Sequence, residues 1–388
     1  MMTQDSPARS IFLCAGCTAL AYFAVGLPLA VLPGWALKLG FGPVMAGFLI
    51  SAQYVATVLS RIVVGPMIDR SGPRRAIVLG FVCCLGAGAT TIAALWITAP
   101  MAAMAVMMAS RILLGFSESL VSTSAMAWGI MRLGAHQSAR MISWNGIATY
   151  AAIAGGAPAG VWIFELGGVT ALGLALLLLG AGGLAFVWPQ PAARVPAAQR
   201  WPMRTVFGAV LPFGAALAMA TVGFGVITSF VTLYFNAFGW GDAWMALTAF
   251  GCAFIASRLL FVRSVARHGG LSVSAVFIAI ELAGLAIMAS APSAHLAIAG
   301  AAVTGFGFAM VFPALGVPVI ERVPEQSRGT ALSTFALFID VALCLTGPLA
   351  GALAQHATYA APFGGAAIGA GLALGMVALL MLRPKPAL

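Results

Sequence analysis

Four charged side chains lie inside long apolar stretches of this sequence, where charges are costly and usually kept for a function. They are Arg111, Glu118, Glu281 and Asp340. A carboxyl group in such surroundings can bind and release a proton, because burial favours its neutral form and an approaching cation favours its charged form. These residues therefore indicate proton or ion binding within an apolar body.

Arg111 and Glu118 are the first candidates for this chemistry. They are seven residues apart, about two turns of a helix, and so share one helix face. The residues around Glu118 form a polar patch: Ser117, Ser119, Ser122, Thr123 and Ser124. We expect Glu118 to carry a proton for which a substrate competes. A static pair of Arg111 with Glu118, or a polar contact between helices, is the alternative.

Asp340 is the matching candidate in the second half of the chain. It lies twelve residues beyond Arg328, which is about 18 Å along a helix and near the middle of its apolar stretch. No basic residue is near it in that stretch. It could bind substrate or proton, and the alternative is a protonated Asp hydrogen-bonded within a helix bundle.

The amino-acid composition indicates which class of protein carries these buried charges. The chain has 388 residues, of which 62% are hydrophobic and only 7% charged, with a formal net charge of +10. A soluble domain carries roughly 25% charged residues. The composition excludes a soluble enzyme, a nucleic-acid-binding protein and a disordered chain. Long unbroken apolar runs, without the alternation of a membrane β-barrel, predict an all-α membrane protein.

Twelve transmembrane helices are expected, with short loops and no room for a soluble domain. The predicted spans are 11–36, 44–66, 76–97, 101–128, 141–163, 168–188, 205–236, 243–263, 271–291, 295–320, 329–354 and 359–382.

The basic residues predict the orientation of these spans, because Lys and Arg concentrate in cytoplasmic loops. With the N-terminus inside, inner segments would hold 15 of the 19 basic residues. Lys38 alone falls in an outer loop, and Arg61, Arg111 and Arg258 fall within or at the ends of spans. We expect both termini in the cytoplasm and the protein in a bacterial-type inner membrane, where the basic loops need no nucleic acid to explain them.

An internal repeat divides the chain. Arg61 and Gly72 recur as Arg258 and Gly269, each 197 residues later, which is about half the chain. The proline-rich and arginine-rich segment 189–204 lies between the halves. We therefore expect an N-terminal six-helix bundle over 1–188, a cytoplasmic linker over 189–204 and a C-terminal bundle over 205–388. Parallel repeats of this kind are typical of transporters, with the substrate site between them.

The second predicted inner loop carries a motif. It contains Gly65, Asp69, Arg70, Gly72, Arg74 and Arg75 in the order Gly-x-x-x-Asp-Arg-x-Gly-x-Arg-Arg. This resembles the loop between helices 2 and 3 of the major facilitator superfamily (MFS), and with the spans and the repeat the resemblance covers the whole chain. It implies two pseudo-symmetric six-helix bundles that work by alternating access.

The resemblance also implies a role for this loop as a latch on the inner gate. Asp69 would face Arg328 at the start of helix 11. Gly65 would let two helices approach closely, and Gly72 would permit a tight turn. The alternative is that Arg70 and the other arginines only set the topology.

Two further motifs resemble the drug-antiporter and sugar-efflux branches. Residues 111–115 read Arg-x-x-x-Gly in helix 4, and residues 155–160 carry a Gly/Pro pattern in helix 5, although its Gly-Pro pair is here Ala157-Pro158. A kinked helix with small-residue packing explains the second motif equally well. In the family Arg111 would be a structural or proton-modulating arginine. Glu281 falls in helix 9, which the resemblance places at the lipid-facing periphery, and we expect a neutral structural Glu there.

Helices 1, 4, 7 and 10 line the cavity in this family. The polar and aromatic candidates for cavity walls on helices 1, 2, 5 and 7 are Tyr22, Gln53, Tyr54, Asn145, Tyr150, Tyr234 and Asn236. Cys14 and Cys17 form a C-x-x-C without a second ligand pair, so we expect packing rather than a metal site.

These observations together predict a proton-coupled secondary transporter and no enzyme activity. The sequence has no phosphate-binding loop for ATP, and we expect no cofactor and no metal. We expect efflux of a small organic compound, such as a drug, sugar or metabolite, by proton antiport from a monomer in the lipid bilayer. An uptake symporter is the first alternative, and a membrane receptor or scaffold without transport is the second.

Overall fold

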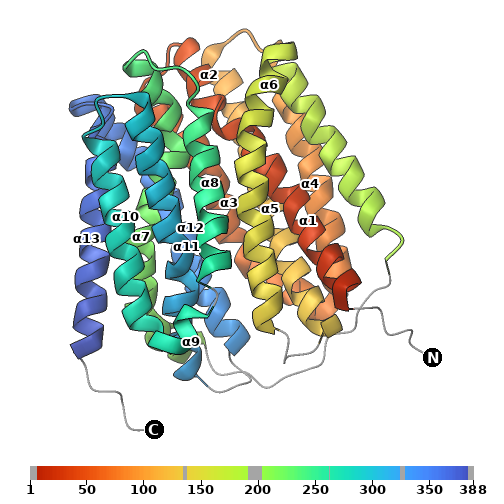
Figure 1. Ribbon diagram of the computed structural model, residues 1–388. Helices are drawn as coiled ribbons and strands as arrows, with labels where there is room; N and C mark the ends of the chain where they lie inside the picture. Colours follow the sequence, from red (N-terminus) through yellow and green to blue (C-terminus); the bar gives the residue numbers. More distant parts are fainter. Residues whose placement is uncertain (1–6, 134–137, 191–202, 262, 324–327, 383–388) are drawn as a thin grey trace. The chain divides into compact units, whose positions relative to one another are not determined.

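The computed structural model describes residues 7–133, 138–190, 203–261, 263–323 and 328–382, and every regular element in them is a helix (Figure 1). The helices of the first half are α1 (Pro7–Leu29), α2 (Leu32–Lys38), α3 (Pro43–Ser71), α4 (Pro73–Ala93), α5 (Pro100–Leu133) and α6 (Ser138–Val187). Those of the second half are α7 (Met203–Ala237), α8 (Trp244–Leu260), α9 (Ser264–His268), α10 (Gly270–Ala289), α11 (Ala294–Glu321), α12 (Arg328–His356) and α13 (Ala361–Leu382).

Helices are present for all twelve expected spans. Ten described helical stretches are long and apolar enough to cross a membrane, and α8 is a shorter apolar helix. One of the ten covers two expected spans, because α6 breaks at Gly167 and Gly168, where φ reaches 62° at Gly168. The first expected span, 11–36, is not continuous. It breaks between α1 and α2, since Pro33 has no N–H to donate to the carbonyl of Leu29.

The chain packs as two compact units, Met1–Phe41 with Ala52–Ala197, and Gly42–Ser51 with Ala198–Leu388. The helix pairings within the two units correspond. In the first unit, α4 and α1 each pack on α5 and α6. In the second unit, α10 packs on α11 and α13, and α7 packs on α11, α12 and α13 (Figure 1). The same pattern in each unit supports the duplication that the sequence repeat predicts.

The repeat is also visible in backbone geometry. Gly72 directly precedes α4 with φ 79° and ψ 157°, and Gly269 directly precedes α10 with φ 80° and ψ 152°. Such positive φ values favour glycine, because a Cβ would meet the neighbouring carbonyl. The tight turn expected at Gly72 is therefore present, together with a second copy 197 residues later.

The first turns of α3 pack with the second unit, which the expected boundary of 1–188 did not foresee. Gly47 lies against Gly347 of α12 so closely that a Cβ on either glycine would overlap the other's backbone. The Ser51 hydroxyl donates to the carbonyl of Leu343 at 3.0 Å. Of the expected linker 189–204, residues 191–202 lie outside the described residues.

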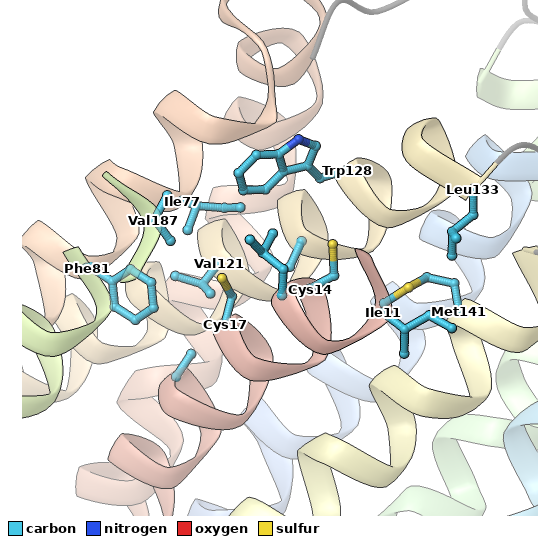
Figure 2. Packing of buried hydrophobic residues seen from close by; sticks show 13 residues of the cluster. Ile11, Cys14, Cys17, Ile77, Phe81, Val121, Trp128, Leu133, Met141 and Val187 are labelled. Carbon is cyan, nitrogen blue, oxygen red and sulfur yellow. The ribbon is translucent and has the colours of Figure 1, made fainter. Parts of the chain in front are cut away.

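Cys14 and Cys17 belong to the apolar core of the first unit. Both are free, fully buried thiols on α1, and Figure 2 shows them among Val121, Ile77 and Trp128. The cluster consists of Ile11, Leu13, Cys14, Cys17, Ala21, Ile77, Phe81, Val121, Ala125, Trp128, Leu133, Met141 and Val187. The expectation that these cysteines serve as packing residues is confirmed.

Arg258 has a structural role in the second unit. Pro313 lies inside α11, and its missing N–H leaves the carbonyl of Ala309, four residues earlier, without its helical donor. The Arg258 Nε donates to this carbonyl at 2.8 Å, and its guanidinium lies 5.2 Å from the ring centroid of Phe254. The position of the Arg258 charge within an expected span is thus explained, because Pro313 leaves the Ala309 carbonyl free to accept a hydrogen bond from it.

This contact predicts a measurable coupling between Arg258 and Pro313. Arg258→Ala should lower the free energy of unfolding by about 1.5–3 kcal/mol, the range for hydrogen bonds to charged groups. In a Pro313→Ala background the loss should shrink, because the substituted alanine would supply the missing N–H. A double-mutant cycle on thermal unfolding of the purified protein measures this coupling, and equal losses in the two backgrounds would contradict it.

Candidate functional site

Glu118 lies where α3 and α5 of the first unit meet. Its side chain is 5% exposed, and its Oε2 accepts a hydrogen bond from Nε2 of Gln53, which is fully buried on α3. Gly115 makes this contact possible, since a Cβ there would overlap the backbone carbonyl of Gln53. The Thr57 hydroxyl also bridges the helices, with the Gln53 carbonyl at 3.2 Å and the Gly115 carbonyl at 3.5 Å.

Gln53 is a partner that can serve both protonation states of Glu118. Its amide N–H donates to an ionised carboxylate, while its Oε1 makes no hydrogen bond to any described residue. A rotation of the amide by half a turn would present this oxygen as an acceptor to a protonated carboxyl. A lysine or arginine could only donate, so it would hold Glu118 ionised.

The hydroxyls beside Glu118 add further polar groups within the bundle. Ser119 and Ser124 are buried, and their Oγ atoms have no hydrogen-bond partner among the described residues. The expected polar patch is therefore inside the protein rather than on its surface.

Arg111 does not form the static pair with Glu118 that was one alternative. The side chain is 1% exposed, and none of its three nitrogens makes a hydrogen bond to a described residue. It interacts electrostatically with Tyr54 and Glu118 without direct contact. The guanidinium borders a small cavity of about 10 Å³ between α1, α2, α4, α5 and α6, which is room for about one water molecule.

Two hydroxyls face the same cavity. Ser110 and Thr91 lie 2.7 Å apart, and each is within 2.8 Å of the Ala87 carbonyl. The hydroxyl protons of Ser110 and Thr91 take part in these hydrogen bonds. The remaining lone pairs of the two oxygens are therefore acceptors at the cavity that Arg111 also lines. Arg111 therefore contributes a positive charge to the core of the first unit, two turns from Glu118.

The other predicted cavity residues of the first unit differ in burial. Tyr54 is buried on α3, and Tyr22 on α1 and Tyr150 on α6 are half-buried. Asn145 on α6 accepts a hydrogen bond from the Thr18 hydroxyl of α1 at 2.6 Å. Asn145 thus holds two helices together.

Two predicted cavity residues of the second unit lie in the last turn of α7. Tyr234 is 1% exposed and donates its hydroxyl proton to the Met288 carbonyl at 2.8 Å. Its ring packs against Phe235, Phe238, Trp240 and Phe363, so it is a packing residue. Asn236 is exposed near the end of α7, and its place in a cavity wall stays a prediction.

Asp340 occupies the position that its spacing predicts. The helix α12 begins at Arg328, so Asp340 lies near its middle, and its side chain is 5% exposed. It is a buried acid of the second unit, as Glu118 is of the first.

Glu281 is enclosed by neighbouring helices, and the expected neutral, structural Glu stays a prediction. Its side chain is 0% exposed, and it lies between α10, α7 and α11. Two glycines, Gly223 and Gly307, bring the neighbouring helices close enough to cover it. Neither carboxyl oxygen makes a hydrogen bond to a described residue.

The motif around Gly72 is described in part. Arg74 donates to the Trp188 carbonyl at the end of α6 and lies 5.9 Å from the Trp188 ring centroid, so it has a role beyond topology. Arg70 and Arg75 are exposed, and Arg328 is exposed at the first residue of α12. The side chain of Asp69 lies outside the described residues, and the latch stays a prediction.

The close helix approach expected at Gly65 is not seen. A Cβ at this position would meet no described atom within 4 Å. Close approaches of the first unit occur elsewhere, among them Gly115 on α5 and Gly156 on α6, where a Cβ would come within 2.9 Å of the Gly26 Cα. Packing of α1 on α6 therefore explains the Gly/Pro pattern of residues 155–160.

Sequence reasoning named Gln53 and Glu118 separately and missed that they form a pair. The available signal was Gly115, because a glycine one turn from a buried acid marks a place where another helix comes near. The Arg258–Ala309 contact was missed as well, and Pro313, four residues after the exposed carbonyl, was its signal.

Comparisons with known proteins agree with this fold. A family model described as the Major Facilitator Superfamily matches residues 14–346 and 243–388. An uncharacterized MFS-type transporter of Burkholderia mallei (strain SAVP1) is 43% identical over 374 residues, covering 94% of this chain and 90% of the relative. One of Pseudomonas aeruginosa (strain LESB58) is 43% identical over 340 residues, covering 87% and 85%.

Solved structures show the same fold at low identity. The human organic anion transporter MFSD10 (TETRAN) superposes with a TM-score of 0.70 at 15% identity, covering 96% of this chain and 100% of that one. A point mutant of the nucleoside transporter NupG gives 0.69 at 16% identity, with the same coverage. The chain belongs to the major facilitator superfamily: it is a multi-pass, all-α membrane transporter and not an enzyme.

The contact at Gly115 predicts a strong effect of adding one methyl group. Gly115→Ala should lower the free energy of unfolding by about 3 kcal/mol or more, because the Cβ would overlap a backbone atom that cannot move aside. Gly182 on α6 has nothing within 4 Å of a built Cβ and is the matched control. There the same change should be neutral or stabilising by up to about 1 kcal/mol. Thermal unfolding of both variants measures the difference, and a stable Gly115→Ala protein would refute the described contact.

Proposed function

We propose that this protein exports a small organic compound in exchange for protons, with Glu118 as the proton-carrying group. The observation that supports this most directly is a buried carboxyl whose partner, Gln53, can stabilise it both with and without a proton. The Gln53 amide can donate to the ionised carboxylate and, after rotation, accept from the protonated carboxyl, so a change of protonation need not leave Glu118 without this partner.

The exchange would follow from competition at one group. An ionised Glu118 binds a cationic or hydrogen-bond-donating substrate, and a proton from the other side displaces it. Arg111 adds a positive charge two turns away, which favours the ionised form and so makes release of the proton easier. Asp340 would provide a second acidic group from the other half of the chain.

The two six-helix halves, 1–188 and 205–388, would rock about the substrate site in alternating access. We place both termini and the linker 189–204 on the cytoplasmic side of a bacterial inner membrane, from the distribution of basic residues. The motif with Asp69 and Arg328 would close the cytoplasmic gate. We expect a monomer to be sufficient.

Uptake by proton symport is the second candidate. The Gly/Pro pattern that resembles the antiporter branch is explained by packing of Gly156 on α1, which carries no information on direction. In a symporter the protonated Glu118 would favour substrate binding, so the sign of the pH effect distinguishes the two.

A substrate is needed before this sign can be measured. Thermal-shift screening of the purified protein against drugs, sugars and metabolites at two pH values should identify a stabilising compound, since a ligand that binds the folded state raises its stability. Two buried acids and one buried arginine favour cations and neutral amphiphiles.

For such a compound we predict that binding weakens as pH falls, by up to about tenfold per pH unit, because one proton competes with it. Glu118→Gln should abolish this pH dependence and reduce proton-driven flux in proteoliposomes. The variant should fold normally, since a glutamine oxygen can still accept from Gln53. Glu165 is exposed, and Glu165→Gln is the matched control that should keep the pH dependence.

Three results would contradict the proposal in different ways. Tighter binding at low pH in the wild type would favour symport. Unchanged proton-driven flux in Glu118→Gln would remove Glu118 from the coupling site. No flux by the wild type under any gradient would favour a receptor or scaffold.

A further inference from the structure

Glu281 is a buried acid that takes no part in the proposed exchange at Glu118. It lies on α10 with 0% of its side chain exposed, and neither Oε1 nor Oε2 has a hydrogen-bond partner among the described residues. Burying an ionised carboxylate without a partner is far more costly than burying its neutral form. The carboxyl must therefore hold a proton in this conformation.

The space around this carboxyl is formed by glycines on two neighbouring helices. A Cβ at Gly223 of α7 would lie 3.0 Å from Oε1, and a Cβ at Gly307 of α11 would overlap the Glu281 backbone. The next turn of α10 adds Leu285, whose Cδ1 would be 2.9 Å from the Gly223 Cβ. The two glycines thus make room for this side chain. A methionine or a glutamine could fill the same room, but neither has a carboxyl proton that it could release.

No described charged or titratable group acts on Glu281. The only titratable groups described on α11 are His295 and Glu321, near its two ends, and those on α7 are Arg204 and Tyr234, at least ten residues from Gly223. The helix α13, which also packs on α10, contains no titratable residue between Ala361 and Leu382.

Two hydroxyls on the neighbouring helices already donate their protons to backbone carbonyls. Thr304 of α11 donates to Gly300 at 2.8 Å, and Thr221 of α7 donates to Leu217 at 2.8 Å. Only displacement of a covering helix can then expose the carboxyl to water or to a proton acceptor. Gly223 lies directly against Oε1, so α7 is the helix whose movement would uncover it.

We propose that Glu281 is a proton-binding site of the second unit, occupied in this conformation and emptied when α7 moves away from α10. The inference extends the proposed proton coupling, because it adds a proton that binds and leaves with a movement inside one half of the chain. A structural carboxyl would hold its proton until the protein unfolds, and a coupling carboxyl releases it from the folded state.

Infrared spectroscopy of the full chain in lipid nanodiscs tests the site with the proton itself as the probe. At about pH 7, where a free glutamate is ionised, the wild type should show a C=O stretching band of a protonated carboxylic acid that is missing from Glu281→Gln and is kept in Glu118→Gln. Glu281→Asp should move the band rather than remove it, which guards against misfolding of one variant. Carboxylate bands alone in the wild type would overturn the proposal.

Release is tested by raising the pH of the same sample. The band should disappear reversibly by about pH 10, above the values documented for buried glutamates, while circular dichroism stays unchanged. A band that persists until the protein unfolds would mean a purely structural carboxyl and would overturn the proposal.

The function of the site is tested separately from that of Glu118. With the compound from the thermal-shift screen, Glu281→Gln should change the pH profile of flux, and an unchanged profile would overturn the role in coupling. If the proposed exchange at Glu118 is wrong, Glu118→Gln transports normally while the Glu281 band remains. If this inference is wrong, the band is missing while Glu118→Gln still loses the pH dependence.

Discussion

A polar group in an apolar bundle must find its partners inside the protein, and in this chain glycines and prolines decide where those partners can be. Gly115 brings the backbone of α5 against α3 and so places Gln53 within reach of Glu118. Pro313 exposes a carbonyl on α11 that Arg258 then binds. Gly223 and Gly307 allow α7 and α11 to enclose Glu281. The positions of the charges follow from these backbone features.

The three buried acids differ in their surroundings, and this gives them different chemistry. Glu118 has an amide that can serve either protonation state and an arginine two turns away. Glu281 has no polar partner among the described residues and is covered by a glycine of α7. Asp340 lies mid-helix on α12 in the second unit. A single carboxyl could exchange one proton, whereas acids in both halves allow each half to change protonation as it moves.

The fold could be predicted from the sequence because its signals are long and repeated. Apolar stretches of sufficient length, the recurrence of Gly72 as Gly269 and the motif of residues 65–75 all point to one architecture. The break at Ala30–Val31 and the packing of residues 42–51 with the second unit were missed, since they depend on one missing N–H and on close contacts between glycines.

The candidate site was predicted only in part. The burial of Glu118, Gln53 and Asp340 could be anticipated, because a polar residue in an apolar helix is conspicuous in the sequence. Their roles in binding stay predictions. The packing role of Tyr234 was missed, because the aromatic cluster that holds it joins residues more than one hundred positions apart. The burial of Glu281 depends on two glycines in other helices, and no local pattern reveals it.

The most direct test of the central claim is to count the protons released when a stabilising compound binds to the purified protein in weakly buffered solution. If substrate and proton compete at Glu118, the wild type should release about half a proton per bound compound at the pH where Glu118 of the free protein is half-protonated, and close to one at lower pH. Glu118→Gln should bind the compound without this release. Equal proton release by the two proteins, or none by the wild type at any pH, would contradict the account.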